Sequence, residues 1–519
     1  MSAQEKAESL HKADGGLDGH PVAVPPTEYE IDETSDVAGK FLARIAQRED
    51  AAELLAPHSE REEKVLLRKV DWIMMTLLQF ALMMGSVDKV SIGSAAVLGL
   101  RTDLNLQGQE YSLTSAAIYF GAICSIIPSL ALMQRVPANL YISTMVMCWG
   151  IITCMMPLCT NYSTFFGVRF LLGIFESVIF AGFGLIVSMW WTRKEQPFRT
   201  AIIFSTLSSV MNGLLATAAQ SYKGTALKQW QLLFMIVGLI TFVWSIMLFC
   251  FLPASPTSAW WLTLRQRVIA TRRQAGNHTG MESKQWKWAQ FFEALYDPKT
   301  WLIFCINLVL NIPNGGLVTF NSIIVASLGF TIQQTTLLGI PTGVISWISS
   351  LFFGWLAVKT GQRCYAAMAA CVIPLVGTIL LYTVPRSNIG GSLVSLYLVY
   401  FYWGPYIVMM GSVYANTGGY TKKMIVYALS YIGYSVGNIV GPLTFTTDQA
   451  PKYTGGVIAM LVCYCAAIFL ILAYRFLIQY SNRQRERTRQ GLGDLDSNDL
   501  LAEWQDQTDF KNPRFVYEL

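Results

Sequence analysis

Two charged residues, Arg169 and Glu176, stand inside an otherwise apolar stretch that runs from residue 165 to residue 190. They are seven residues apart, close to two turns of an α-helix, so both side chains would lie on one face. A charge at the centre of a lone membrane helix costs about 2.5–3.5 kcal/mol on insertion scales and marks a functional site by default. We therefore expect this face to look onto another charged helix, a water-filled cavity or a substrate.

Only two other charges lie deep within an apolar run, the adjacent residues Asp88 and Lys89. Two acids and two bases in such places can bind an anion and exchange a proton. They can also form two salt bridges that only fasten helices together, although four buried ions are a costly way to do so. We favour a mixed interpretation, in which one opposite-charge pair is structural or a gate and one acid and one base remain free to act.

The C-terminal half offers amide and phenol groups in place of charges. Asn307, Asn311 and Asn314 recur at helical spacing and form one amide stripe. Pro313 and the two glycines after Asn314 are expected to break that helix and to free backbone groups that must line a cavity or find new partners. A small anion could then lie between these amides and a base such as Lys89.

A second polar stripe comes later in the chain, where Tyr431, Tyr434 and Asn438 share one helical face. We expect these residues and the asparagines to hydrogen-bond a substrate whose carboxylate is bound by Lys89. The same run carries glycines four residues apart, a spacing typical of close helix packing: Gly433, Gly437 and Gly441.

The elements that must position these groups are membrane helices. The chain has 519 residues, 53% of them hydrophobic and 14% charged, with a mean hydropathy of +0.40, which is too apolar for a soluble protein. Apolar runs long enough to cross a bilayer are expected at 71–98, 112–134, 139–160, 164–191, 200–221, 231–253, 300–327, 335–358, 364–384, 391–416, 424–446 and 456–479.

Twelve helices in two halves is the layout of a major facilitator transporter, an all-α membrane fold whose halves are related repeats. The predicted parts are an N-terminal tail, a six-helix bundle, a central loop, a second six-helix bundle and a C-terminal tail: 1–66, 67–253, 254–298, 299–480 and 481–519. Lys and Arg gather in the loops on the same side as both termini, so this side and the two tails should be cytosolic. We expect both tails to be flexible, the membrane to be the plasma membrane, and the protein to be monomeric.

Composition and motifs exclude several other classes of protein. The net charge of +5 comes without the clustered basic face that nucleic-acid binding needs. The ten cysteines have no metal-site or disulfide spacing, and none of the four histidines lies in an apolar run. No phosphate-binding loop or HExxH motif is present. We therefore predict no enzyme activity, no metal site and no cofactor other than a proton gradient.

Several short motifs occur in order along the chain: Asp88-Lys89, Arg169-Phe-Leu-Leu-Gly173-x-x-Glu176, Trp190-Trp191, Leu252-Pro253-x-Ser255-Pro256 and Gly437-Asn438-Ile-Val-Gly441-Pro442. Together they resemble the anion:cation symporter family of the major facilitator superfamily, and within it the fungal allantoate permease branch. The resemblance covers roughly residues 70–480.

This resemblance implies roles for the four buried charges. Glu176 would be the proton site, Lys89 would contact the substrate, and Asp88 would pair with Arg169. Many family members have arginine where Lys89 stands, so a point charge replaces a guanidinium that could grip a carboxylate with two hydrogen bonds.

Our leading hypothesis is proton-coupled symport of a small organic anion by alternating access, with a ureido acid such as allantoate, a nicotinate-like acid or another monocarboxylate as substrate. The alternative is a proton-antiport exporter of a metabolite or drug, because one fold can host both functions. Such an exporter should have a more apolar cavity than the asparagine and tyrosine stripes indicate. A non-transporting nutrient receptor would be favoured by a large folded tail, and neither tail shows a folding pattern.

Overall fold

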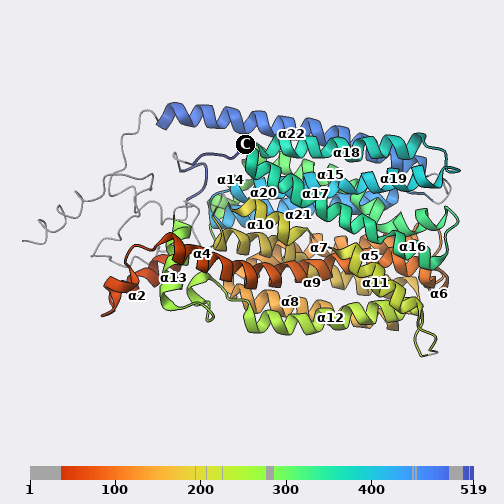
Figure 1. Cartoon of the computed structure of the whole chain (residues 1–519), viewed down its shortest axis with the longest axis horizontal. Helices are drawn as coiled ribbons and strands as arrows, with labels where there is room; N and C mark the ends of the chain where they lie inside the picture. Colours follow the sequence, from red (N-terminus) through yellow and green to blue (C-terminus); the bar gives the residue numbers. More distant parts are fainter. Residues whose placement is uncertain are drawn as a thin grey trace, which may run out of the picture.

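The computed structural model describes residues 37–192, 195–205, 207–224, 226–275, 286–446, 449, 453–489, 507–512 and 515–519. In this part of the chain there are no strands, and twelve helices are long and apolar enough to cross a membrane. They run side by side along the long axis of the molecule (Figure 1). The predicted all-α fold with twelve spans is thus confirmed.

The first six spans form the N-terminal half. Its elements are α4 (Glu60–Val70), η1 (Asp71–Met75), α5 (Thr76–Ala95), η2 (Ala96–Leu100), α6 (Arg101–Asp103), α7 (Glu110–Arg135), α8 (Ala138–Met155), η3 (Met156–Leu158), α9 (Tyr162–Trp190), α10 (Gln196–Phe204), α11 (Ser208–Gln220) and α12 (Gln229–Phe251). The first span is longer than predicted because α4, η1 and α5 continue as helix into η2, where the non-helical backbone of Gly99 (φ +103°) kinks the chain before α6. The fifth is divided into α10 and α11.

The last six spans form the C-terminal half. Its elements are α15 (Pro298–Ala326), α16 (Ile332–Leu338), α17 (Ile340–Thr360), α18 (Arg363–Thr383), α19 (Ile389–Val399), η5 (Tyr400–Tyr402), α20 (Trp403–Ala415), α21 (Tyr420–Leu443) and α22 (Thr454–Arg489). The last helix continues well beyond the predicted span.

The expected break at Pro313 does not occur, because α15 is helical throughout. Its glycines serve packing: a side chain at Gly315 would place Cβ 2.8 Å from the Asn438 backbone of α21. In return, a Cβ at Gly437 of α21 would lie 2.5 Å from the Leu308 carbonyl oxygen of α15. The predicted glycine face of α21 is therefore confirmed as a close helix contact, and it fixes α15 against α21.

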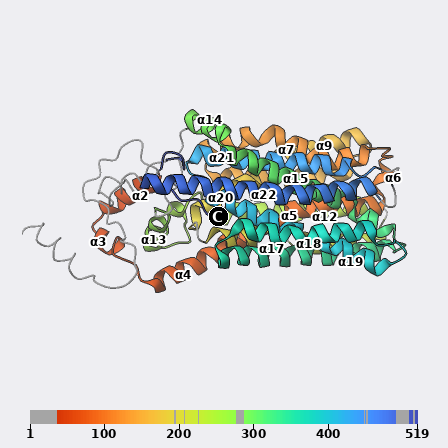
Figure 2. The same cartoon turned by 90° about the horizontal axis from the view of Figure 1, so that it is seen from above.

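Extra helices gather at the end of the molecule that carries both tails, on the left in Figures 1 and 2. We call it the tail end. These helices are α2 (Val37–Ala46) and α3 (Ala51–Leu54) before the first span, and α13 (Leu264–Ala275) and α14 (Trp288–Tyr296) between the halves.

The expectation of flexible tails is wrong for residues 37–66 and for the described C-terminal residues 507–512 and 515–519. Leu42, Ile45 and Leu54 pack against Val268 of α13 in a small separate core. Arg265 of α13 donates to carbonyl groups that follow the end of α3, which satisfies backbone acceptors that the helix leaves open. Apolar contacts between segments far apart in sequence thus order this region, and a local sequence pattern does not reveal them.

Candidate functional site

A cavity lined mainly by polar side chains lies between the two halves. Its walls carry hydroxyl, amide and aromatic side chains, and Lys89 is the only charged residue in the lining that the structure describes. The lining consists of Ser86, Lys89, Val90, Ser94, Tyr119, Ser208, Ser209, Asn212, Asn314, Val318, Asn321, Ser322, Thr335, Thr336, Gly339, Thr342, Gly343, Ser346, Tyr400, Tyr402, Trp403 and Tyr434.

Lys89 of α5 forms a buried ion pair with Glu176 of α9. The ammonium group also lies 5.8 Å from the centre of the Tyr434 ring, from the opposite half. The second carboxylate oxygen of Glu176, Oε2, is buried and accepts no hydrogen bond from the described residues. The structure thus joins the predicted substrate base directly to the predicted proton site, although the roles themselves stay predictions.

Asp88 and Arg169 are both buried but form no ion pair within 4 Å. Asp88 Oδ2 instead accepts a hydrogen bond from the Trp149 indole nitrogen (3.1 Å). Arg169 Nε and Nη1 have no hydrogen-bond partner among the described residues. The expected contact between these two residues is therefore not made in this arrangement of the helices, and their functional pairing stays a prediction.

The amide stripe of α15 forms a hydrogen-bonded network with α21. Asn314 Nδ2 donates to Asn438 Oδ1 (2.9 Å), and Asn314 Oδ1 accepts from the Tyr402 hydroxyl (2.6 Å). Asn311 Nδ2 donates a hydrogen bond to the Asn307 carbonyl (2.7 Å). Since each of these buried groups has a partner, the network holds Asn314 in a fixed position at the cavity wall.

The predicted substrate-binding residues divide into two groups. Lys89, Asn314 and Tyr434 line the cavity. Asn311, Tyr431 and Asn438 are outside that lining and support it: Asn438 binds Asn314, and the Tyr431 ring stacks on Tyr434 at 5.4 Å between centres.

Among the polar groups at the cavity that sequence reasoning missed are Asn321 and Thr335. Asn321 Oδ1 and Thr335 Oγ1 are buried atoms that have no hydrogen-bond partner in the described part of the chain. A signal was available for Asn321, because it continues the asparagine stripe two turns after Asn314. For Thr335 the signal is a hydroxyl stripe with Thr342 and Ser346, spaced seven and four residues apart.

Contacts between the halves close both sides of the cavity. Away from the tail end, the Tyr111 hydroxyl donates to the Thr319 carbonyl (2.8 Å). Toward the tail end, the Trp403 indole donates to the Phe204 carbonyl (3.0 Å), and the Tyr414 ring packs closely over Gly184.

The arrangement of two six-helix halves around a polar cavity has known counterparts. A family model described as Major Facilitator Superfamily matches residues 75–442. The chain belongs to this superfamily. It is a membrane transporter and not an enzyme, as predicted, since its relatives and its fold are those of transporters.

Two relatives match this transporter over nearly its whole length. The MFS-type transporter cnsL of Penicillium expansum is 36% identical over 518 residues and 100% of both chains. Allantoate permease of Saccharomyces cerevisiae is 32% identical over 496 residues, which is 92% of this chain and 91% of the permease. The predicted allantoate permease-like branch is thereby confirmed.

Solved structures share the fold at low sequence identity. The fucose:proton symporter of E. coli superposes with a TM-score of 0.55 at 14% identity, over 78% of this chain and 98% of the symporter. An inward-facing bacterial homologue of the human lysosomal transporter Spinster gives a TM-score of 0.54 at 13% identity, over 81% and 97% of the two chains.

Proposed function

We propose that this transporter is a proton-coupled symporter of a small organic anion, acting by alternating access as a single chain in the plasma membrane with both tails in the cytosol. The observation that carries the proposal is the ion pair between Lys89, at the cavity wall, and the buried acid Glu176. One ammonium group thus stands between two possible anionic partners, the Glu176 carboxylate and the carboxylate of a substrate.

The net charge of this site couples the proton to the anion. In the empty carrier, Lys89 and Glu176 neutralise one another. When a proton neutralises Glu176, Lys89 is free to pair with the substrate, and the site is again neutral. Binding of the proton alone or of the anion alone leaves one unbalanced buried charge, which is costly in a membrane. The empty and the doubly loaded carriers are therefore the forms that reorient most readily, which is the requirement for symport.

The polar atoms at the cavity narrow the class of anion. Asn321 Oδ1 can only accept hydrogen bonds, so it favours a substrate that carries N–H or O–H donors away from its carboxylate. The Thr335 hydroxyl can either donate or accept a hydrogen bond. A ureido acid such as allantoate fits this pattern, and so does another monocarboxylate with amide or hydroxyl groups. The relative named allantoate permease supports the same class.

The lining also bears on the alternative of an exporter. Its abundant hydroxyl and amide groups suit a solute that forms many hydrogen bonds. An exporter of amphipathic compounds would be expected to expose a more apolar wall.

Uptake into proteoliposomes tests the proposal. We expect labelled allantoate, or a related acid from a set with nicotinate, pantothenate and ureidosuccinate, to accumulate above equilibrium when the outside is more acidic, and to lose this accumulation when an ionophore removes the gradient. Equilibration without accumulation would contradict proton coupling. Accumulation driven only by the opposite gradient would indicate proton antiport.

A further inference from the structure

The chain segments at residues 507–512 and 515–519 return to the tail end of the C-terminal half and pack into it. Thr508 and Asp509 are 1% and 0% exposed, and Phe515 and Tyr517 join the main hydrophobic core. Arg485 of α22 donates to the Asn512 and Phe515 carbonyls and fixes the far part of the segment. The polar C-terminal tail therefore ends in a segment that packs against the helices of the C-terminal half.

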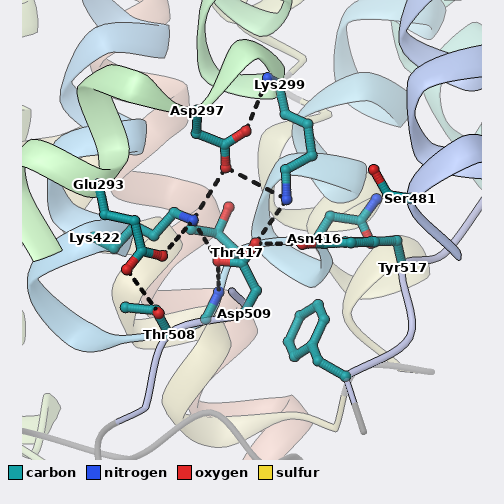
Figure 3. Close-up of polar contacts among 12 residues, drawn as sticks. Glu293, Asp297, Lys299, Asn416, Thr417, Lys422, Ser481, Thr508, Asp509 and Tyr517 are labelled. Atoms are coloured by element: carbon teal, nitrogen blue, oxygen red, sulfur yellow. Dashed lines mark hydrogen bonds and ion pairs between the residues drawn. The ribbon is translucent and has the colours of Figure 1, made fainter. Parts of the chain in front are cut away.

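Asp509 lies between two buried lysines (Figure 3). Its Oδ2 contacts Lys299 Nζ at 2.6 Å, and its Oδ1 contacts Lys422 Nζ at 2.7 Å. Lys299 belongs to the first turn of α15 and Lys422 to the first turn of α21. Burial alone would raise the pKa of Asp509, but the two ammonium groups outweigh it and hold this pKa well below its usual range. Asp509 thus ties together the helices that carry Asn314 and Tyr434.

Two glycines, Gly418 and Gly419, leave the space in which the segment packs. A Cβ at Gly418 would lie 2.6 Å from the Asp509 backbone nitrogen, and a Cβ at Gly419 would lie 2.9 Å from the Thr508 side chain. Gly419 also has φ of +85°, which side chains rarely tolerate. Any side chain at this notch would therefore push the segment away.

The arrangement of carboxylates and lysines around Asp509 allows the segment to detach from the helices. With Asp509 docked, three carboxylates face the two lysines. Without it, Asp297 still contacts Lys299 (3.4 Å) and Lys422 (3.1 Å), and Glu293 still contacts Lys422 (3.0 Å). Two lysines then face two carboxylates, so no buried lysine loses its last anionic partner and undocking avoids the large penalty of an unpaired buried charge.

The held end of α21 also belongs to the contact between the halves. Tyr427, five residues after Lys422, packs its ring 4.8 Å from that of Tyr414. Tyr414 in turn lies against Gly184 of α9, in the other half. Movement of the first turns of α21 would therefore reach the closed contact at this side of the cavity.

We propose that residues 507–512 and 515–519 form a latch, which holds the first turns of α15 and α21 together and keeps the cavity closed at the tail end. Undocking of the latch loosens that closure. That the tail end faces the cytosol, so that the latch controls substrate release there, rests on the function proposed above.

Hydrogen exchange of the full-length protein, measured by mass spectrometry without substrate, tests the latch. Asp509→Asn removes the charge and keeps the shape, and Gly418→Ala fills the notch and keeps every charge. In both variants we expect exchange over residues 507–519 to rise at least about tenfold, with a smaller rise over residues 410–431. Lys511→Gln, an exposed change in the same segment, serves as the matched control and should leave both regions as in the wild type.

Two outcomes would overturn the latch. In the first, residues 507–519 stay as protected in both variants as in the wild type. In the second, they lose protection while residues 410–431 exchange at the wild-type rate, so the segment is only a packed end. A thermal melt of each variant verifies folding, and Gly418→Ala carries the test if Asp509→Asn does not fold. Neither readout needs a substrate, so a failure of proton-driven uptake would count against the proposed function alone.

Discussion

The two halves of this transporter keep their buried charges in different places. The N-terminal half has four in the middle of its spans: Asp88, Lys89, Arg169 and Glu176. The C-terminal half lines its side of the cavity with amides and phenols, and the lysines of the cluster around Asp509 lie in first helical turns at the tail end. We propose that the charge chemistry belongs to the N-terminal half, while both halves supply hydrogen-bonding groups to the cavity.

The tail ends differ as well. In the N-terminal half, Arg199 binds Asp71 with two hydrogen bonds of 2.8 and 2.9 Å, and Arg273 joins Glu63 to Glu195. Guanidinium groups suit such fixed two-point contacts, whereas lysines act as point charges with several exchangeable partners. The arginine ion pairs at the tail end of one half thus contrast with the lysine contacts of Asp509, in the proposed latch, at the tail end of the other.

The largest effect is expected from Lys89→Ala, which removes the base of the N-terminal half. We expect uptake of the anion to fall by at least about 100-fold, because the cavity loses the one charged group in its described lining and Glu176 is left without its ion-pair partner Lys89. Uptake into proteoliposomes measures this, and Lys89→Arg is the control that keeps the charge. Substantial uptake by the Ala variant would place anion binding elsewhere.

A smaller effect is expected from Asn314→Ala in the C-terminal half. Truncation leaves Tyr402 and Asn438 without their partners, at a cost of about 1–3 kcal/mol per buried group. We expect KM to rise about tenfold while the pH dependence of uptake stays as in the wild type. A shifted pH dependence would mean that Asn314 also affects the proton step, which would contradict the proposed division of roles between the halves.

Trp149→Phe tests how Asp88 acts. The variant removes the hydrogen bond that Asp88 accepts, and we expect transport to slow by about fivefold, which corresponds to about 1 kcal/mol, the net contribution of a typical hydrogen bond. Asp88→Asn is measured beside it. If Trp149→Phe transports normally while Asp88→Asn does not, Asp88 works through Arg169 and the predicted pair forms in another state of the cycle.

The smallest effect concerns selectivity at Asn321. We expect Asn321→Ala to weaken uptake of a ureido acid by about threefold and to leave a plain monocarboxylate unaffected, because only the former offers a donor to Oδ1. Competition between the two acids measures the ratio. Equal losses for both would remove Asn321 from the recognition site.

Sequence alone located the spans, and three of the residues predicted to bind substrate, Lys89, Asn314 and Tyr434, lie at the cavity wall. The span predicted at 164–191 corresponds to α9 at Tyr162–Trp190, because a long apolar run is a local signal. The partner of each charge is not local. Adjacent residues such as Asp88 and Lys89 point about 100° apart on a helix, so the one that meets Glu176 depends on helix rotation, which packing decides.

The same reason explains why Asn311 and Asn438 support the cavity and do not line it. Asp509 could not be placed from sequence at all. Its contact with Lys299 joins residues 210 positions apart, and no local pattern in a polar tail predicts such a partner. The glycine spacing of α21, in contrast, correctly predicted a close helix contact, since small residues have few other uses inside a membrane helix, but the structure was needed to show that the partner is α15.

The most direct test of the account is Glu176→Gln, with proton-driven uptake and substrate exchange measured on the same proteoliposomes. The amide cannot take up a proton and no longer competes for Lys89, so the account predicts that accumulation under an acidic outside pH disappears while exchange of internal for external anion continues. Accumulation that survives in this variant would contradict the assignment of Glu176 as the proton site and, with it, the proposed link between Lys89 and the proton.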